Sequence, residues 1–337
     1  MRKSNLDLAR VAAITAVVLG HSMMIFWDFD PASPVWAVYN LLWILIRGTL
    51  MLFFMISGTL FLDREKMDFK RHMRRTLHFL LLFYAWSLLC NAIDTLWLHY
   101  WTGDGTFVTR VLSGYFHLWF LPTMALCYCA LPLLHGLAHG NADNAWKGAL
   151  LLFAIVTVKT TLDAIPNKPE WFEALLHPYD LKYFRYFVIM PLGWQLSRRR
   201  LSNRALTILG AVTLAACVFF AWLNRRHAIS VGAAVDTFYG DLTVTAGLMA
   251  CFLYSLVLRV ETLPSRMAGP LKTLSACSFG VYLIHPVLID VLRSRHWDLT
   301  QYSALWLFPL CFVCFLLLSF GLSGLLLRIP GVRKLVS

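Results

Sequence analysis

The stretch at residues 303–327 reads SALWLFPLCFVCFLLLSFGLSGLLL and contains no charged residue. About 20 consecutive apolar residues let a helix cross the hydrocarbon core of a bilayer, so this stretch predicts a membrane span. Nine further apolar runs precede it, at residues 7–27, 38–62, 76–97, 115–136, 146–166, 182–197, 205–223, 238–258 and 273–292. We therefore predict an all-α membrane protein, a bundle of about ten transmembrane helices.

The composition of the whole chain agrees with that prediction. Of its 337 residues, 59% are hydrophobic and 14% are charged, whereas soluble domains are roughly 45–50% apolar and about 25% charged. This excludes a soluble enzyme and an intrinsically disordered chain. The first run is too long for a signal peptide and no small-residue cleavage site follows it. Because the sequence has no internal repeat and no linker, we expect one membrane domain over residues 1–337.

The net charge of +12 can reflect either nucleic-acid binding or membrane topology. We favour topology because basic residues concentrate in cytoplasmic loops. If the ten runs cross in turn, one set of loops and both termini carry 18 Lys and Arg residues, and the opposite loops carry 7. Both termini are therefore predicted to be cytoplasmic, and no nucleic-acid partner is expected.

The eight cysteines all lie inside apolar runs, where we expect them to act as small hydrophobic residues. Cys311 and Cys314 form a CxxC pair, but the neighbouring sequence offers no further ligand, whereas structural zinc takes four. The sequence predicts no metal site.

The first apolar run contains ionisable side chains, which are costly in a membrane and therefore indicate a functional site. On a helix Arg10, His21 and Asp28 share one stripe, Asp7 lies nearby, and Arg10 is about 16 Å from His21 along the axis. His21 has two interpretations. It is either a structural histidine bonded to a neighbouring helix or a group that takes up a proton near neutral pH.

Two arginines follow the second run. Arg71 and Arg74 are three residues apart and would share a helix face if the third helix begins early. Guanidiniums in this arrangement bind phosphate groups bidentately. The alternative is that they serve only as a positive-inside topology signal.

Other polar and aromatic residues fall in or near the runs. Arg47, Asp241 and His285 are expected in the middle or outer half of the membrane, where with His21 they suggest a polar cavity reachable from outside. Lys159 and Asp163 are four apart and are expected to neutralise each other. Several tryptophans lie at outer helix ends, where they form either an interfacial belt or a platform for a sugar ring: Trp27, Trp36, Trp97, Trp101 and Trp119.

Five segments in order resemble the acyltransferase 3 family of integral membrane acyltransferases. They are Arg10 with His21 eleven residues later, LFFMISG at 52–58, Arg71 with Arg74, FHLWFL at 116–121, and FGVYLIHP at 279–286. The resemblance covers most of the chain. The chain is most similar to the short members of the family, which lack an appended periplasmic hydrolase-like domain.

The resemblance implies transfer of an acyl group, usually acetyl, from cytosolic acyl-CoA to a hydroxyl of a cell-envelope glycan in the bacterial inner membrane. Acetyl-CoA would be a co-substrate, and no bound cofactor is expected. His21 would be the general base, and an acyl-histidine intermediate is an alternative. Arg10 would either guide the pantetheine or phosphates of the donor or orient His21 through Asp7. Arg71 and Arg74 would bind the donor. The implied acceptor-side or cavity residues are Arg47, His117, Trp119, Tyr282 and His285.

Two other classes of protein compete with this interpretation. A transporter or flippase of a glycan or lipid-linked intermediate also needs charges in a polar cavity, but it typically shows inverted repeats and paired broken helices, which this sequence lacks. A structural or assembly protein would not need Arg10, His21, Arg47 and His285 within the membrane.

Overall fold

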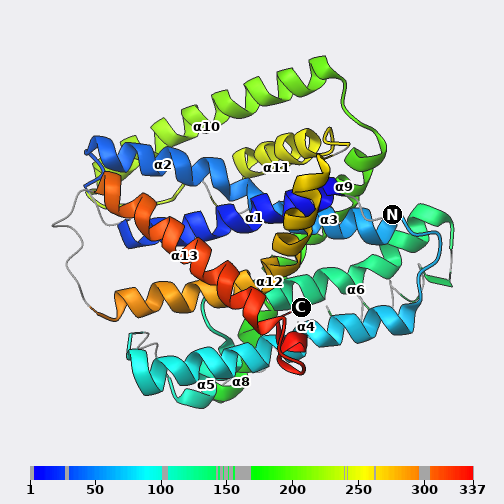
Figure 1. Ribbon diagram of the computed structural model, residues 1–337, viewed down its shortest axis with the longest axis horizontal. Coiled ribbons are helices and arrows are strands. Elements are labelled where there is room, and N and C mark those ends of the chain that lie inside the picture. The colour runs from blue at the N-terminus through cyan, green and yellow to red at the C-terminus, as the bar shows by residue number, and fades with distance from the viewer. Residues whose placement is uncertain are drawn as a thin grey trace. The chain divides into compact units, whose positions relative to one another are not determined.

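The computed structural model describes residues 4–26, 30–100, 105–141, 143–144, 147, 151, 155, 168–238, 240, 242–261, 263–295 and 304–336. Every regular element in this part of the chain is a helix (Figure 1). About ten helices are present, and seven are long and apolar enough to cross a membrane. The predicted all-α membrane fold is therefore confirmed.

The chain forms two compact units. Unit 1 comprises Met1–Ile56 and Gln195–Ser337, and unit 2 comprises Ser57–Trp194. Two helices, α3 (Met51–Leu62) and α9 (Ile189–Arg198), contribute residues to both units. The expectation of one domain over residues 1–337 stays a prediction.

Unit 1 is built around its first helix. Its long elements are α1 (Ser4–Met23), α2 (Pro34–Arg47), α10 (Asn203–Val231), α11 (Val244–Val257), α12 (Ser265–Arg293) and α13 (Ala304–Leu326). α1 packs against α12, α13, α2 and α11, as Figure 1 shows. A single turn of 3-10 helix, Met24–Phe26, follows α1, and another, Val332–Leu335, ends the unit.

The contacts of α12 give the directions of the helices in unit 1. Asp7 near the start of α1 bonds Ser275, and Met24 just after α1 bonds Arg293, so α1 and α12 run parallel. Ser323 near the end of α13 bonds the carbonyl of Cys277, so α13 runs antiparallel to α12. The start of α1 and the end of α13 therefore lie at the same end of unit 1.

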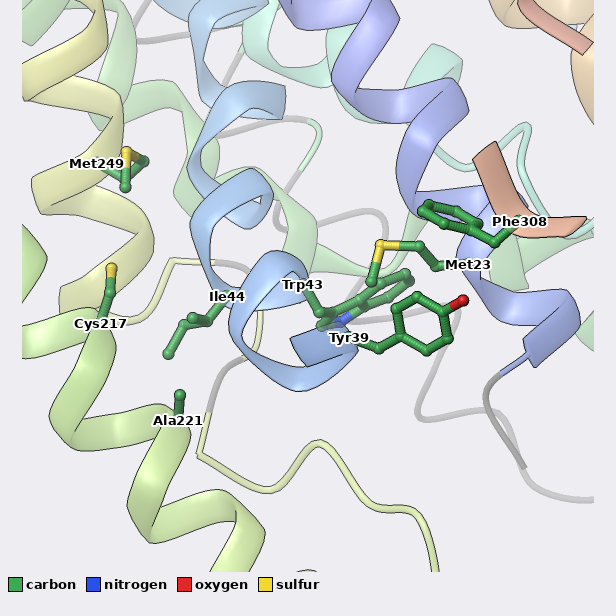
Figure 2. Close-up of a cluster of buried hydrophobic side chains, with 8 residues drawn as sticks. All are labelled: Met23, Tyr39, Trp43, Ile44, Cys217, Ala221, Met249 and Phe308. Atoms are coloured by element: carbon green, nitrogen blue, oxygen red, sulfur yellow. The ribbon is translucent and has the colours of Figure 1, made fainter. Parts of the chain in front are cut away.

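The core of unit 1 lies next to the end of α1. Met23 and Phe308 pack with Tyr39 and Trp43 of α2, and the cluster continues through Ile44 (Figure 2). It also includes Cys217, Ala221 and Met249 from α10 and α11. Met23, which follows His21 by two residues, is fully buried. This packing fixes the turn of α1 that carries His21.

The second apolar run changes helix type at a glycine. α2 begins with Ser33 as its N-cap and Pro34 in its first turn, and it gives way at Gly48–Leu50 to one turn of 3-10 helix before α3. A Cβ at Gly48 would lie 2.4 Å from the backbone oxygen of Ala246. The glycine thus permits the close approach of α11, as small residues do in membrane bundles.

Unit 2 contains one pair of long helices and several short ones. α4 (Phe69–Ile93) packs against α6 (Phe120–His139), and α5 (Phe107–Ser113) packs against α8 (Glu170–Leu176). α4 ends in a π-helical turn, Asp94–Leu98. The remaining elements are the 3-10 turns His177–Tyr179 and Leu181–Val188.

Several helix limits differ from the sequence prediction. α4 begins at Phe69 rather than 76, because Asp68 caps it by accepting a hydrogen bond from the backbone N–H of Arg71. α10 continues to Val231 rather than ending at 223. Gly232 then ends the helix with a positive φ of 67°. Only half of the run at 182–197 is α-helix. Most of the run at 146–166 lies outside the described residues.

Candidate active site

The predicted base, His21, is hydrogen-bonded to a second histidine in unit 1. Its Nδ1 lies 2.7 Å from Nε2 of His285, which α12 presents toward α1. His285 is fully buried, and its Nδ1 lies 2.8 Å from the carbonyl oxygen of Val281 one turn earlier. We call His21 and His285 the histidine pair. The structure brings together two predicted site residues that are 264 positions apart.

The contact within the histidine pair is an in-plane hydrogen bond. The two rings are tilted by 14° and their centres are 4.9 Å apart. That separation is one short N–N distance plus two ring radii, so the nitrogens face each other along the line between the ring centres. This is the geometry in which a ring N–H points at the lone pair of its partner.

The ends of α1 are fastened to α12 on both sides of the histidine pair. Asp7 is buried, accepts a hydrogen bond of 2.7 Å from Ser275, and lies 3.3 Å from the guanidinium of Arg10. At the other end Arg293 donates to the carbonyl of Met24. Asp7 is about 21 Å from His21 along α1, so Asp7 and Arg10 form a separate polar group.

Two guanidiniums act electrostatically on His21, those of Arg47 and Arg293. Arg47 lies 4.8 Å above the ring of Trp43 and 3.1 Å from the carboxylate of Asp236, which is half exposed. The loop that carries Asp236 is held by Asn224, whose side chain bonds the carbonyl of Val235. Positive charge near His21 is suited to an oxyanion that forms beside it.

Three arginines come together in unit 2. The guanidinium carbons of Arg64 and Arg75 lie 5.0 and 5.8 Å from the centre of the Phe61 ring. Partial desolvation, with the positive charges of Arg75 and Arg71, lowers the pKa of Arg64 from its ordinary value. We call Arg64, Arg71 and Arg75 the arginine cluster. Among the described residues, no carboxylate forms an ion pair with any of them.

Of the two predicted donor arginines, the structure places only Arg71 in this cluster. Arg71 and Arg74 are both in the first two turns of α4 and exposed, as an early helix start requires. Sequence reasoning missed Arg64 and Arg75. The signal that could have found Arg75 is its i,i+4 spacing from Arg71, which places the two on one face once the helix starts at Phe69.

Aromatic and histidine side chains pack next to the arginine cluster. Phe61 packs edge-on against His72 and Tyr128, and the buried Nε2 of His72 donates to the carbonyl of Tyr128 over 2.7 Å. Nε2 of His135 donates likewise to the carbonyl of Arg64 over 2.7 Å. Both imidazoles anchor backbone carbonyls, so they hold the cluster in place.

The remaining predicted acceptor-side residues are mostly buried. His117 and Tyr282 are 2% and 8% exposed, and Trp119 lies 5.9 Å from the ring of Tyr186. Trp36 is fully buried, so its expected place in an interfacial belt or sugar platform is wrong; it belongs to the core. Trp97 is 57% exposed, as a belt residue would be. Residues 27, 28, 101, 159, 163 and 241, which the sequence analysis also named, lie outside the described residues.

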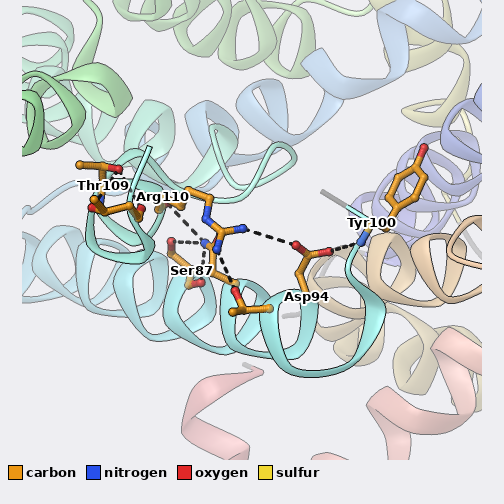
Figure 3. Close-up of polar contacts among 8 residues, drawn as sticks. Ser87, Asp94, Tyr100, Thr109 and Arg110 are labelled. Carbon is orange, nitrogen blue, oxygen red and sulfur yellow. Dashed lines mark hydrogen bonds and ion pairs between the residues drawn. The ribbon is translucent and has the colours of Figure 1, made fainter. Parts of the chain in front are cut away.

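An ion pair that the sequence did not indicate ties α5 to the end of α4. The guanidinium of Arg110 lies 3.6 Å from the buried carboxylate of Asp94 and donates to Thr95 (Figure 3). Asp94 also accepts from the backbone N–H of Tyr100. Since the π-helical turn starts at Asp94, this ion pair stabilises an irregular helix end.

Comparison with known proteins identifies one family. The family described as "Acyltransferase domain" matches residues 3–328, nearly the whole chain. No curated protein and no solved structure matches the chain.

Proposed function

Since this chain belongs to the acyltransferase family that spans residues 3–328, and is a multi-pass membrane protein, we propose that it transfers an acetyl or other short acyl group. The donor is cytosolic acyl-CoA and the acceptor is a hydroxyl of a cell-envelope glycan. Within the family we expect it to be related to short members such as the enterobacterial-common-antigen O-acetyltransferase. Its location would be the bacterial inner membrane, with both termini in the cytoplasm.

The single observation that carries this proposal is the histidine pair within a membrane acyltransferase. A sugar hydroxyl is a poor nucleophile at neutral pH, so a base must remove its proton as the oxygen attacks the thioester carbon. His21 is partly buried, and its Nδ1 is hydrogen-bonded to His285. Arg47 and Arg293 would stabilise the oxyanion that forms on the thioester carbonyl.

The arginine cluster supports an anionic donor. Three guanidiniums held close together without a carboxylate repel one another, so an anion that joins them is bound favourably. Acyl-CoA carries phosphate groups, which match guanidinium forks. We assign Arg64, Arg71 and Arg75 to these phosphates. We expect Arg74 to contribute less to donor binding.

Arg10 and Asp7 are proposed to support the site indirectly. Asp7 receives hydrogen bonds from Arg10 of its own helix and Ser275 of α12. Loss of either partner would leave a buried carboxylate incompletely bonded and would loosen α1 from α12. Their contribution to catalysis is therefore expected through the position of α1.

The proposal is tested with purified protein in nanodiscs, radiolabelled acetyl-CoA and a panel of envelope glycans. We expect release of CoA and label on the glycan, both lost in His21→Ala. The alternative function, a transporter or flippase, predicts movement of a lipid-linked glycan across vesicles without CoA release. That result would overturn the proposal.

The expected orientation has its own test. A reporter that is active only in the periplasm, fused after Ser337, should remain silent. The structure places the start of α1 and the end of α13 at the same end of unit 1, so a reporter at the N-terminus should be silent too. Activity of the reporters would assign the donor and acceptor sides in reverse.

A further inference from the structure

The carbonyl of Val281 determines which nitrogens of the histidine pair carry hydrogen. A carbonyl oxygen only accepts, so the 2.8 Å contact requires that Nδ1 of His285 carries a hydrogen and donates it. In a neutral imidazole the other nitrogen then has the lone pair. Nε2 of His285 is therefore the acceptor of the 2.7 Å contact, and Nδ1 of His21 is its donor. In the neutral pair, Nε2 of His21 has the lone pair.

We propose that His285 is a positioning residue: it holds His21 in the Nδ1–H tautomer, so that Nε2 of His21 removes the proton from the acceptor hydroxyl. This inference rests on the proposed acyl transfer. An isolated imidazole in water exists as both tautomers and turns freely about its side-chain bonds. The bond to His285 selects one tautomer and one ring orientation, as an outer partner does for a histidine that ligates a metal.

His285 can hold His21 in this way because its own position is over-determined. It is fully buried on α12 and its Nδ1 is bonded to Val281. The register of α1 on α12 is fixed by the Asp7–Ser275 bond on one side of the pair and the Arg293–Met24 bond on the other. A ring rotation at His285 would break both of its hydrogen bonds in a buried site.

The proposed step balances in atoms and charge. The O–H bond of the acceptor breaks, its oxygen forms a bond to the thioester carbon, and the proton goes to Nε2 of His21. The resulting imidazolium keeps its Nδ1–H bond to Nε2 of His285, so the shared proton spreads the charge over two rings. When the carbon–sulfur bond breaks, the proton on Nε2 passes to the departing CoA sulfur, and the pair returns to its neutral form.

The charged groups around the pair come from two of the helices packed on α1. α2 contributes Arg47, and α12 contributes Asp290 and Arg293; α11 and α13 contain no charged residue. Asp290 is buried five residues after His285, and Arg293 donates to the Met24 carbonyl. His285 is hydrogen-bonded directly to the ring of His21.

Two substitutions at His285 separate positioning from packing. His285→Leu fills the space but cannot accept a hydrogen bond from His21, whereas the amide oxygen of His285→Gln can accept one. His227→Gln is the matched control, because His227 lies on α10, contacts Phe238 and has no role in the proposed step. Thermal unfolding of each variant reports on packing.

The direct readout is the nitrogen-15 NMR signal of His21 in protein labelled at histidine. We expect the Nδ1–H tautomer in the wild type and in His285→Gln, and a shift toward the Nε2–H tautomer in His285→Leu. We also expect kcat of His285→Leu to fall about 10- to 100-fold, with KM for acetyl-CoA nearly unchanged, and His285→Gln to recover much of this loss. The His227→Gln control should match the wild type.

Two results would overturn the inference: an unchanged tautomer of His21 in His285→Leu, or a changed tautomer with unchanged kcat. Failure of the proposed function is a different result, since it appears as no use of acetyl-CoA by the wild type while the tautomer measurement stays interpretable. If His285→Leu does not fold, His285→Gln provides the test. A lower kcat in His285→Gln, with His21 still in the Nδ1–H tautomer, would also contradict the positioning role of His285.

Discussion

In unit 1 the charges of the site residues are paired, Arg10 with Asp7 and Arg47 with Asp236. In unit 2 the guanidiniums of Arg64, Arg71 and Arg75 lie together, and no carboxylate among the described residues neutralises them. Paired groups favour fixed geometry, which proton transfer requires. Like charges gathered near water favour an anion that arrives and leaves. The two arrangements fit the proposed chemical step and the proposed donor-binding step.

The largest effect should come from the paired region. His21→Ala removes the proposed base and should lower kcat about 10²- to 10⁴-fold, while acetyl-CoA affinity and thermal stability stay close to those of the wild type. The measurement is transfer of labelled acetyl by the purified variant. Near-normal turnover would remove His21 from the mechanism, and the paired region would then have no assigned chemical step.

A smaller effect, on affinity rather than turnover, should come from the arginine cluster. Arg71→Ala and Arg75→Ala each remove a charge-assisted contact worth about 1.5–3 kcal/mol, so acetyl-CoA affinity should weaken roughly 10- to 100-fold. Lysine at either position should rescue only part of the loss, because a point charge lacks the bidentate fork. Isothermal titration with a non-hydrolysable acetyl-CoA analogue measures this.

Arg74→Ala is the matched comparison within the same two turns of α4. Arg74 was predicted with Arg71 as a donor residue, but no contact ties it to the ring of Phe61. Its substitution should therefore weaken affinity less than that of Arg75. Equal affinities in all three alanine variants and the wild type would leave these arginines with only a topology role.

One glycine from each unit illustrates how closely another backbone can approach. In unit 2 a Cβ at Gly58 would lie 1.9 Å from the backbone oxygen of Met190, whereas Gly247 in unit 1 has nothing within 4 Å of that position. Gly58→Ala should destabilise the protein by about 1–3 kcal/mol, and Gly247→Ala should be neutral or slightly stabilising. Thermal unfolding in matched nanodiscs compares them, and equal midpoints would contradict the close approach.

The smallest predicted effect concerns the start of α4. Asp68→Ala removes the side chain that caps the helix beside Arg71 and should cost about 1 kcal/mol of stability. Asp68→Asn keeps a capping oxygen and should cost much less. If acetyl-CoA affinity also falls in Asp68→Ala alone, the cap contributes to the arginine cluster by fixing the first turn.

The sequence predicted the helical membrane fold because each span needs a long apolar run, and a run can be read from neighbouring residues. It predicted His21 for the same reason, since an ionisable side chain in such a run is costly. It could not predict that His285 is the partner of His21, because the pairing depends on how α12 packs on α1. Phe61 and Arg64 were missed likewise: their contacts with Arg75 depend on the loop before α4.

Trp36 shows a related limit of sequence reasoning. A tryptophan at a predicted helix end is typical of the membrane interface, yet Trp36 is fully buried in unit 1. Ser33 and Pro34 start α2 two residues before it, so Trp36 lies in the first turn of a helix that packs on α10 and α11. Helix-end position alone does not separate a belt residue from a core residue.

The distance in sequence between His21 and His285 has a consequence for biogenesis. The two partners are 264 residues apart, and a ribosome that adds about 5–20 residues per second needs roughly 13–50 seconds to make the intervening chain. During that interval α1 is in the membrane with His21 and Asp7 lacking the α12 groups that bond them in the finished protein. Formation of the histidine pair would therefore be among the last events in the maturation of the protein.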